Sequence, residues 1–300
     1  MKILNGKVAI ITGSGTGIGR AIAIAMAREN AKVVTNNRQP REHGDAESTA
    51  NEIIGLGGEA VPYYGDVSDF EIAAKLIQTA IDHFGRLDIL VNNAGGEDKR
   101  RMPWDMTAED WERTIRTHLN GTFYCLRHAC GTMREQGWGR IINTTSRAWL
   151  QTVERASYAA AMAGVVGLTR AVARDMGRYG VTCNAYTPFA KTRRTGQETL
   201  SKIKRGFDAG VITKQRYEMY ANIPEPETVV PLVVYLSSDE AADINGQVFS
   251  VNAGRISIYS EPTEQKVIYK KEGLWEIEEL INLVPGVLLA GYHNPAPRQP

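Results

Sequence analysis

The sequence has few cysteines, almost no net charge and no long apolar run. Its three cysteines form no CxxC pair, so neither a disulfide framework nor a metal site is predicted. A net charge of +1 argues against a dedicated nucleic-acid or membrane-surface binder. No apolar run approaches the roughly 18–20 residues that span a bilayer. The opening MKILNGKVAIITG leaves no room for a signal peptide. We therefore expect a soluble, cytoplasmic protein with a small-molecule substrate.

Short apolar runs alternate with longer helical patterns along most of the chain. Runs such as KVAIITG (7–13) and LDILVNNAG (87–95) are bounded by glycine, which is typical of strands buried on both faces. Helical patterns separate such runs, and this repetition predicts an α/β fold with a doubly wound parallel sheet of the Rossmann type. We expect a single domain over residues 1–255 and a C-terminal helical extension over residues 256–300.

A glycine-rich turn, TGSGTGIG, joins the first strand to the first helix. Gly13, Gly17 and Gly19 let the backbone turn tightly and approach a pyrophosphate, and the helix N-terminus offers free N–H groups. Because a strand precedes the motif and a helix follows it, the turn indicates a dinucleotide site. Thr16 and Ile18, within the same turn, are assigned to that site.

The end of the second strand usually distinguishes between the two nicotinamide cofactors. A carboxylate there binds the ribose hydroxyls of NAD, but the segment NNRQ (36–39) contains neither Asp nor Glu. Arg38 could instead pair with a 2′-phosphate. The sequence therefore favours NADP, with NAD as the alternative if Arg38 is only a solvated surface residue.

Further motifs point to a known family. GDV (65–67), NNAG (92–95), Ser146, Tyr158 and NAYTP (184–188) follow the glycine turn in the order and spacing of the short-chain dehydrogenases/reductases. The resemblance covers nearly the whole chain before the extension. Within the family, the sequence resembles the (3R)-hydroxyacyl-CoA dehydrogenase domain of peroxisomal multifunctional enzymes and their bacterial relatives. Those enzymes interconvert 3-hydroxyacyl-CoA and 3-oxoacyl-CoA.

The resemblance implies roles for residues on several loops. Asp66 and Val67 would lie at the adenine, and Asn93 and Gly95 would line the nucleotide. Thr192 would hold the nicotinamide carboxamide or a phosphate. The family assembles through symmetric helix faces, so the resemblance also implies a homo-oligomer, or a hetero-oligomer with another subunit of the family.

The catalytic positions follow the family only in part. The resemblance makes Tyr158 the proton donor or acceptor and Ser146 the group that hydrogen-bonds the substrate oxygen. His118 falls on a position that is usually Asn. The family lysine, four residues after the tyrosine, is Met162 here, and the interval from Ser146 to Tyr158 is one residue shorter than usual. Met162 could also simply pack in the core.

The missing lysine carries a chemical consequence. A nearby ammonium favours the phenolate of a tyrosine, whereas methionine brings no charge. We therefore expect oxidation of a hydroxyl to be slow at neutral pH, and reduction, which uses the neutral phenol, to persist. Arg147 and Lys191 are the cations close enough in sequence to replace the lysine.

Three functions are compatible with these residues. The first is an active NADP- or NAD-dependent oxidoreductase that acts on a carbonyl or hydroxyl group of a CoA thioester. The second is a catalytically degenerate subunit that pairs with an active paralogue. The third is a non-redox lyase or epimerase on the same fold. Lys99, Arg100 and Arg101 would suit a CoA phosphate, although a solvated basic loop explains them equally well.

The C-terminal extension contains an amphipathic pattern. Its apolar positions share one helical face: Leu274, Ile277, Leu280, Ile281 and Val284. Pro285 is expected to end this helix. Because the apolar face is too large to leave exposed to water, we expect the helix to lie at a subunit contact or over the mouth of a pocket.

Overall fold

The computed structural model describes residues 2–42, 44–96, 98–150, 152–192 and 197–295. The chain divides into two compact units, Met1–Tyr259 and Ser260–Pro300. The first unit contains the sheet and all the residues predicted for the site, and the second contains most of the extension.

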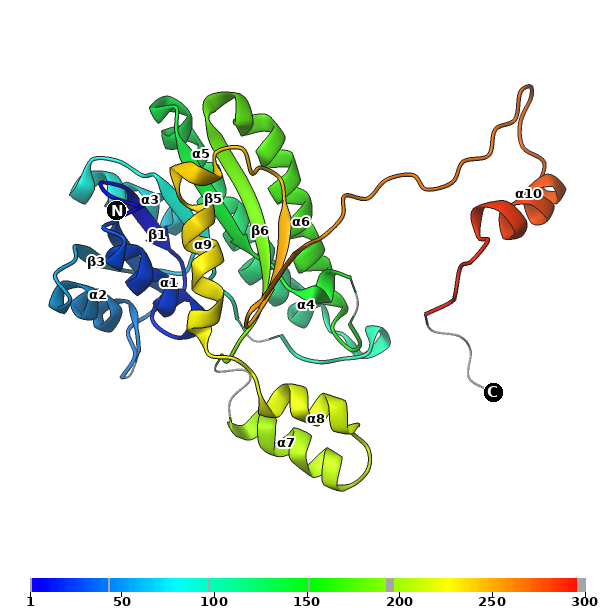
Figure 1. Ribbon diagram of the computed structural model, residues 1–300, viewed down its shortest axis with the longest axis horizontal. Coiled ribbons are helices and arrows are strands. Elements are labelled where there is room, and N and C mark those ends of the chain that lie inside the picture. Colours follow the sequence, from blue (N-terminus) through cyan, green and yellow to red (C-terminus); the bar gives the residue numbers. More distant parts are fainter. Residues whose placement is uncertain (1, 43, 97, 151, 193–196, 296–300) are drawn as a thin grey trace. The chain divides into compact units, whose positions relative to one another are not determined.

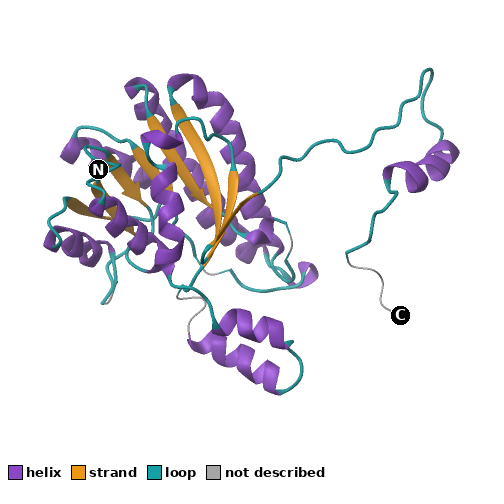
Figure 2. Cartoon of the chain, in the orientation of Figure 1, coloured by secondary structure: helices purple, strands orange, loops and turns teal. Residues whose placement is uncertain are grey.

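The first unit is built on one sheet, whose strands are orange in Figure 2, with the strand order β3-β2-β1-β4-β5-β6-β7-β8. The strands are β1 (Val8–Ile11), β2 (Lys32–Asn37), β3 (Ala60–Tyr64), β4 (Ile89–Asn92), β5 (Gly139–Thr144), β6 (Val181–Phe189), β7 (Val248–Asn252) and β8 (Arg255–Ile258). Neighbours from β3 to β7 pair in parallel, and β8 pairs antiparallel with β7. This doubly wound topology confirms the predicted fold class.

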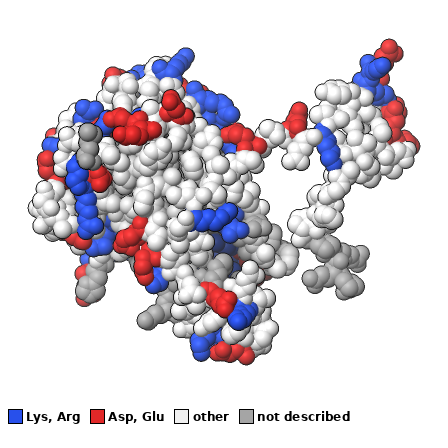
Figure 3. All heavy atoms as spheres, in the orientation of Figure 1, with Lys and Arg blue, Asp and Glu red and all other residues white. Residues whose placement is uncertain are grey.

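Helices cover both faces of the sheet (Figure 1). One face carries α1 (Gly17–Arg28), α2 (Ala46–Gly55) and α9 (Val230–Leu236). The other carries α3 (Phe70–Phe84), α4 (Ala108–Ile115), α5 (Gly121–Gln136) and α6 (Ala156–Met176). The pair α7 (Gln197–Asp208) and α8 (Lys214–Ala221) follows β6. Positive and negative side chains are interspersed on the face that Figure 3 shows, so this face carries no extended field of one sign.

The apolar runs form strands because each is buried on both sides. All four residues of β1 are buried. Ala9 and Ile11 pack in the core under α1 and α9, whereas Val8 and Ile10 pack in the core under α3 and α5. Alternate side chains of one strand thus supply both cores, which explains why the run reads as continuously apolar.

One apolar stretch is longer than the sequence suggested. The helical segment Ala156–Tyr179 is long and apolar enough to cross a membrane by length and composition. The expectation that no run approaches this length is therefore wrong. The reason is that α6 is a core helix, whose residues Val165, Val166 and Ala173 are buried within the unit.

Two predictions for the C-terminal region need correction. The sheet includes β8, whose residues the sequence had assigned almost entirely to the extension. In the second unit, α10 (Ile277–Leu283) continues through Pro285 into a π-helical turn, Val284–Leu288. Proline is tolerated there because it occupies the start of the new turn, where its missing N–H is not needed. No described residue of the second unit is buried.

Candidate active site

The turn between β1 and α1 leaves a bare backbone surface. A side chain at Gly13 (φ +67°) would place its Cβ 2.9 Å from Cα of Ala94, and one at Gly19 would lie 2.5 Å from Nδ2 of Asn93. Gly17 (φ +58°), in contrast, faces open space. Two glycines therefore permit close packing, and the third keeps the N-terminus of α1 uncovered. This arrangement fits a pyrophosphate group.

The end of β4 is tied to this turn by hydrogen bonds. The backbone N–H groups of Asn93 and Ala94 each donate to Oγ1 of Thr12, at 2.9 Å. The side chain of Asn93 donates to the Thr12 carbonyl oxygen, at 3.0 Å. Thr16 is the N-cap residue of α1, and Ile18 is buried in its first turn. The structure thus brings these predicted nucleotide residues together at the carboxyl edge of the sheet.

The end of β2 holds a buried acceptor that the sequence did not reveal. The Oδ1 atom of Asn37 is buried without a hydrogen-bond partner among the described residues. Asn36, its neighbour, is already engaged, since its Nδ2 donates to the Gly65 carbonyl oxygen at 3.1 Å. A buried acceptor without a donor is unfavourable, and a ribose hydroxyl is a donor of suitable chemistry. Arg38, the next residue, is exposed. The segment NNRQ was the only sequence signal for Asn37.

Three other predicted residues follow strands at the same edge. Asp66 and Val67 come after β3, and Oδ1 of Asp66 accepts from the N–H of Ser68 at 3.0 Å. Val67 is buried, and Gly121 approaches it so closely that a Cβ there would lie 3.3 Å from Val67 Cγ2. Thr192 comes after β6 and is half-buried. Their strands place these residues at the edge that carries the glycine turn.

Tyr158 and His118 are in ring contact. Tyr158 lies in the first turn of α6, and its ring centroid is 5.0 Å from that of His118, edge to face. His118 belongs to a π-helical segment, η2 (Arg116–Asn120), between α4 and α5. Gly95 packs against the same imidazole, since a Cβ there would lie 3.0 Å from its Cε1. Such π-helical turns often occur at functional sites, and this one brings a histidine to the predicted proton donor.

Ser146 lies at the start of a short helix that packs on α6. This helix, η3 (Arg147–Trp149), has Ser146 as its N-cap residue, and the serine Oγ accepts from the N–H of Ala148 at 3.3 Å. Ala148 and Tyr158 belong to the same apolar cluster. No described residue accepts a hydrogen bond from the Ser146 hydroxyl. This hydroxyl can therefore donate to a substrate oxygen.

Met162 is a packed core residue. It is 3% exposed and shares its apolar cluster with Tyr158, Ala161 and Val165. Its carbonyl oxygen accepts from Oγ1 of Thr145 at 3.0 Å. The position that carries the family lysine therefore supplies apolar packing beside the tyrosine and no charge.

A cation nevertheless lies beside the tyrosine ring. The guanidinium carbon of Arg155 is 4.1 Å from the ring centroid of Tyr158, a distance at which a cation is attracted to an aromatic face. Nε and Nη2 of Arg155 donate to the two carboxylate oxygens of Asp98, at 2.5 and 2.6 Å. Burial by itself would lower the pKa of Arg155, but the hydrogen bonds and charge of Asp98, with Tyr158 and Tyr220, raise it.

Neither cation named from the sequence has this position. Arg147 is exposed, and Lys191 is exposed and ion-paired with Glu225. The sequence signal for Arg155 was its position three residues before Tyr158, which does not by itself show that the side chain lies over the ring.

A pocket opens beside Arg155, with a volume of about 320 Å³. This wall pocket is lined by Pro103, Ala148, Trp149, Leu150, Thr152, Glu154, Arg155, Ala156 and Ala159. The loop between Ser146 and Tyr158 thus contributes most of the lining of this pocket, including the side chains of Trp149 and Leu150.

The basic loop after β4 is only partly free. Lys99 and Arg101 are ion-paired with the buried carboxylate of Asp110, at 3.3 and 2.6 Å. Arg113, on α4, bonds the same carboxylate at 2.6 Å, and the hydrogen bond from Arg101 holds the pKa of Asp110 far below its usual range. Arg100 is exposed. Two of the three basic residues of this loop are therefore bound to Asp110.

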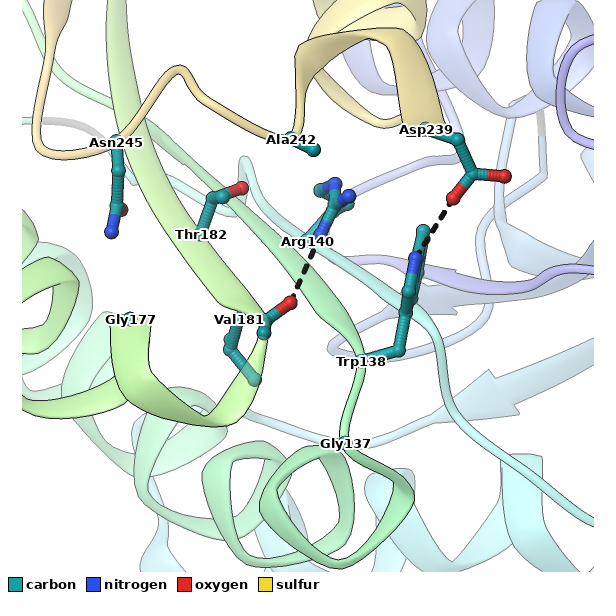
Figure 4. A pocket seen from close by; sticks show the side chains of 10 residues that line it. Gly137, Trp138, Arg140, Gly177, Val181, Thr182, Asp239, Ala242 and Asn245 are labelled. Carbon is teal, nitrogen blue, oxygen red and sulfur yellow. Dashed lines mark hydrogen bonds between the residues drawn. The ribbon is translucent and has the colours of Figure 1, made fainter.

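A cavity of about 330 Å³ lies at the opposite edge of the sheet, where β5 and β6 begin (Figure 4). Arg140 dominates it: Nε donates to the Ser238 carbonyl oxygen at 3.0 Å, and Nη1 donates to the carbonyl oxygens of Gly139 and Gly180 at 2.9 and 3.2 Å. Its guanidinium lies over the Trp138 ring. None of the predicted site residues lines this cavity.

Comparisons with known proteins identify the family of this chain. A sequence model described as short chain dehydrogenase matches residues 7–201. Hydroxyacyl-CoA dehydrogenase ChsB1 of Mycobacterium tuberculosis is 36% identical over 290 residues, covering 92% of this chain and 87% of that protein. Peroxisomal multifunctional enzyme type 2 of Drosophila melanogaster is 35% identical over 257 residues, covering 83% of this chain and 39% of that protein. The crystal structure of a short chain dehydrogenase from Mycobacterium avium has a TM-score of 0.80 and 39% identity, covering 98% of this chain and 97% of that chain.

Proposed function

This chain belongs to the short-chain dehydrogenase/reductase family, and within that family we propose that it interconverts a 3-hydroxyacyl and a 3-oxoacyl thioester of coenzyme A with NADP. It is an oxidoreductase with the hydroxyacyl-CoA dehydrogenase type of sequence, and the family fold uses NAD or NADP. The proposal rests chiefly on the placement of Tyr158. This tyrosine is buried, its ring contacts that of His118, and it lies beside the loop that begins at Ser146.

The choice of substrate rests on two surfaces next to the tyrosine. The wall pocket offers Trp149 and Leu150 to an acyl chain. The basic loop offers the exposed Arg100 to the phosphates of coenzyme A, since guanidinium groups bind phosphate well. The relatives named above act, by their names, on hydroxyacyl-CoA substrates or belong to multifunctional enzymes.

The choice of NADP rests on the end of β2. Asn36 and Asn37 are neutral, so the strand end itself presents no carboxylate to a 2′-phosphate. Arg38 is exposed and forms no ion pair with another described residue, so it can form a charge-assisted hydrogen bond with that phosphate. The unpartnered Oδ1 of Asn37 would accept from a ribose hydroxyl. NAD, which lacks the phosphate, would use Asn37 alone.

The residues divide the reaction between them. A bound nicotinamide supplies hydride acceptance or donation at C3 of the substrate, and proton movement is left to the protein. Ser146 donates its hydroxyl proton in a hydrogen bond to the C3 oxygen. Tyr158 receives the hydroxyl proton when the substrate is oxidised and gives it back when the ketone is reduced. His118 packs edge to face on the Tyr158 ring and limits its rotation.

The second candidate function is a silent subunit that pairs with an active member of the family. The observation that favours it is the apolar burial of Met162 at the lysine position. Such a subunit would keep the nucleotide site and lose turnover. Assembly with a second subunit would also give the apolar residues of α10 a surface to cover, because Ile277 and Ile281 are exposed in the extension. Removing residues after Tyr259 should then change the oligomeric mass.

The function is tested by following NADPH consumption with a 3-oxoacyl-CoA and NADPH formation with the matching 3-hydroxyacyl-CoA. We expect turnover in the reductive direction, and a rate lower by about 10²–10⁴-fold in Tyr158→Phe, which keeps the ring and removes the proton. Phenylalanine preserves the packing against His118, so the variant should bind NADPH as the parent does. Nucleotide binding without turnover in the parent would support the silent subunit. Absence of both would contradict the whole proposal.

A further inference from the structure

Segments far apart in the sequence converge on Arg155. The arginine immediately precedes α6 and lies over the Tyr158 ring. Asp98, from the loop after β4, accepts two hydrogen bonds from it, one on each carboxylate oxygen. The side chain of Arg155 is 20% exposed and that of Asp98 is 5% exposed. Tyr220, on α8, is close enough to act on it electrostatically. A guanidinium that donates from two of its nitrogens to one carboxylate has a fixed plane.

The backbone before Arg155 is also fixed. Glu154 has φ +61°, in the left-handed region that residues other than glycine rarely adopt. Its carbonyl oxygen accepts from the N–H of Arg101 at 2.7 Å, and Arg101 and Arg155 form a parallel bridge. A strained conformation persists only where its surroundings determine it. The shortened loop thus delivers Arg155 to the tyrosine in one defined position.

The charge of Arg155 is coupled to Tyr158. A negative charge on Tyr158 raises the pKa of Arg155, although burial acts in the opposite direction and Asp98 contributes more. The geometry supports this coupling, because the guanidinium carbon lies 4.1 Å from the Tyr158 ring centroid and an opposite charge at such a distance stabilises the charged form of its neighbour. Arg155 is therefore placed to stabilise the tyrosine form that accepts a proton from a hydroxyl.

We propose that Arg155 is a positioning residue that takes over the electrostatic role of the lysine absent at Met162, by stabilising negative charge on Tyr158 while a substrate hydroxyl is oxidised. The inference rests on the proposed function and assigns one step within it. In that step the hydroxyl proton passes to the Tyr158 oxygen, and the C3–H bond gives up its electron pair as the hydride. Arg155 itself exchanges no proton.

Other charged and titratable groups surround this pair. His118 contacts Tyr158 from η2, and Arg147 lies on η3. Asp110 on α4, with Lys99, Arg101 and Arg113 bound to it, lies beyond the bridge of Arg101 with Arg155. Since all of these groups are retained in variants of Arg155 and Asp98, differences between the pH profiles of those variants report on the changed charge.

The test compares pH–rate profiles in Arg155→Gln and Arg155→Lys. Glutamine removes the charge but still donates to Asp98, and lysine keeps the charge. We expect Arg155→Gln to lower the rate of hydroxyl oxidation at neutral pH by about tenfold, to move the midpoint of the profile up by about one pH unit, and to change reduction less. Arg155→Lys should recover most of the loss. A Gln variant with the profile of the parent would overturn the proposal.

Two controls separate the charge from its surroundings. Arg147→Gln removes an exposed arginine of the same region and should leave the profile unchanged. Asp98→Asn with Arg155→Gln removes both partners of the ion pair. If the loss came only from the unpaired carboxylate, this double variant would behave like the parent, and the proposal would fail. We expect it to remain slow, because the guanidinium is the partner in contact with the ring.

A readout without substrate distinguishes this proposal from the proposed function. The ultraviolet absorbance of phenolate, taken as the difference between each protein and its Tyr158→Phe version, follows ionisation of this one tyrosine. We expect the phenolate to form at higher pH in Arg155→Gln than in the parent. That result supports the role of Arg155 even if no acyl-CoA is turned over. An unchanged titration overturns it even if the enzyme is active.

Discussion

Two arginines with aromatic partners lie at the two edges of the sheet, and they have different roles. Arg155, at the carboxyl edge, lies 4.1 Å from the Tyr158 ring centroid, and Arg140, at the amino edge, lies 4.3 Å from that of Trp138. Arg155 donates to a carboxylate, and its pKa is raised. Arg140 donates to carbonyl oxygens, and burial lowers its pKa against the weaker opposing effect of Asp239.

The partners explain the difference. Three carbonyl oxygens from two loops and a strand converge on Arg140, so its charge is used to hold backbone segments together. Asp98 fixes Arg155 on one side and leaves the guanidinium over a tyrosine that can ionise. An indole has no proton to exchange in the physiological range. Of these two arginines, the one whose aromatic neighbour can carry charge is Arg155, and it lies at the edge where ligands of this fold bind.

Among the substitutions that test this comparison, replacing Arg140 is expected to have the largest effect, and that effect is on stability. Arg140→Gln should lower the free energy of unfolding by about 1–3 kcal/mol, because the carbonyl oxygens of Ser238 and Gly180 lose a charged donor. The ratio of oxidation to reduction should not change. Chemical denaturation of parent and variant, with both rates measured on the folded protein, checks this. A variant of normal stability with an altered ratio would mean that the amino edge takes part in the reaction.

A smaller effect, on nucleotide affinity, is expected from replacing a third arginine, Arg38, which has no aromatic partner among the described residues. Arg38→Ala should weaken NADPH binding by about tenfold, as loss of a charge-assisted hydrogen bond implies, and leave NADH binding unchanged. Fluorescence titration of both nucleotides measures this. A parent protein that binds NADH more tightly than NADPH would show that Arg38 is only a surface residue and that Asn37 selects NAD.

The sequence predicts best where a signal is local. The apolar run of β1 and the glycines after it determine a strand, a turn and a helix start within a few residues, and these predictions agree with the structure. The π-helical turn that carries His118 left no such signal, because it depends on packing between α4, α5 and α6. The prediction that Pro285 ends the helix was wrong for a related reason, because the helical backbone continues past it as a π-helical turn.

Arg155 could not be assigned from the sequence because its partners are distant. Asp98 is 57 positions away along the chain, and only the fold brings it to the arginine. The local spacing to Tyr158 was visible, but spacing alone does not show that a side chain folds over a ring. Asn37 was missed similarly, because its unpartnered oxygen is a property of burial.

The most direct measurement is a rescue at neutral pH. If Tyr158 needs a nearby cation and Arg155 supplies it, a cation one helical turn after the tyrosine, at position 162, should serve as well. Met162→Lys added to Arg155→Gln should raise the rate of 3-hydroxyacyl-CoA oxidation by about tenfold over Arg155→Gln alone, with the lysine stem packing where methionine did. A double variant that is folded, binds nucleotide and oxidises no faster than Arg155→Gln would contradict the account.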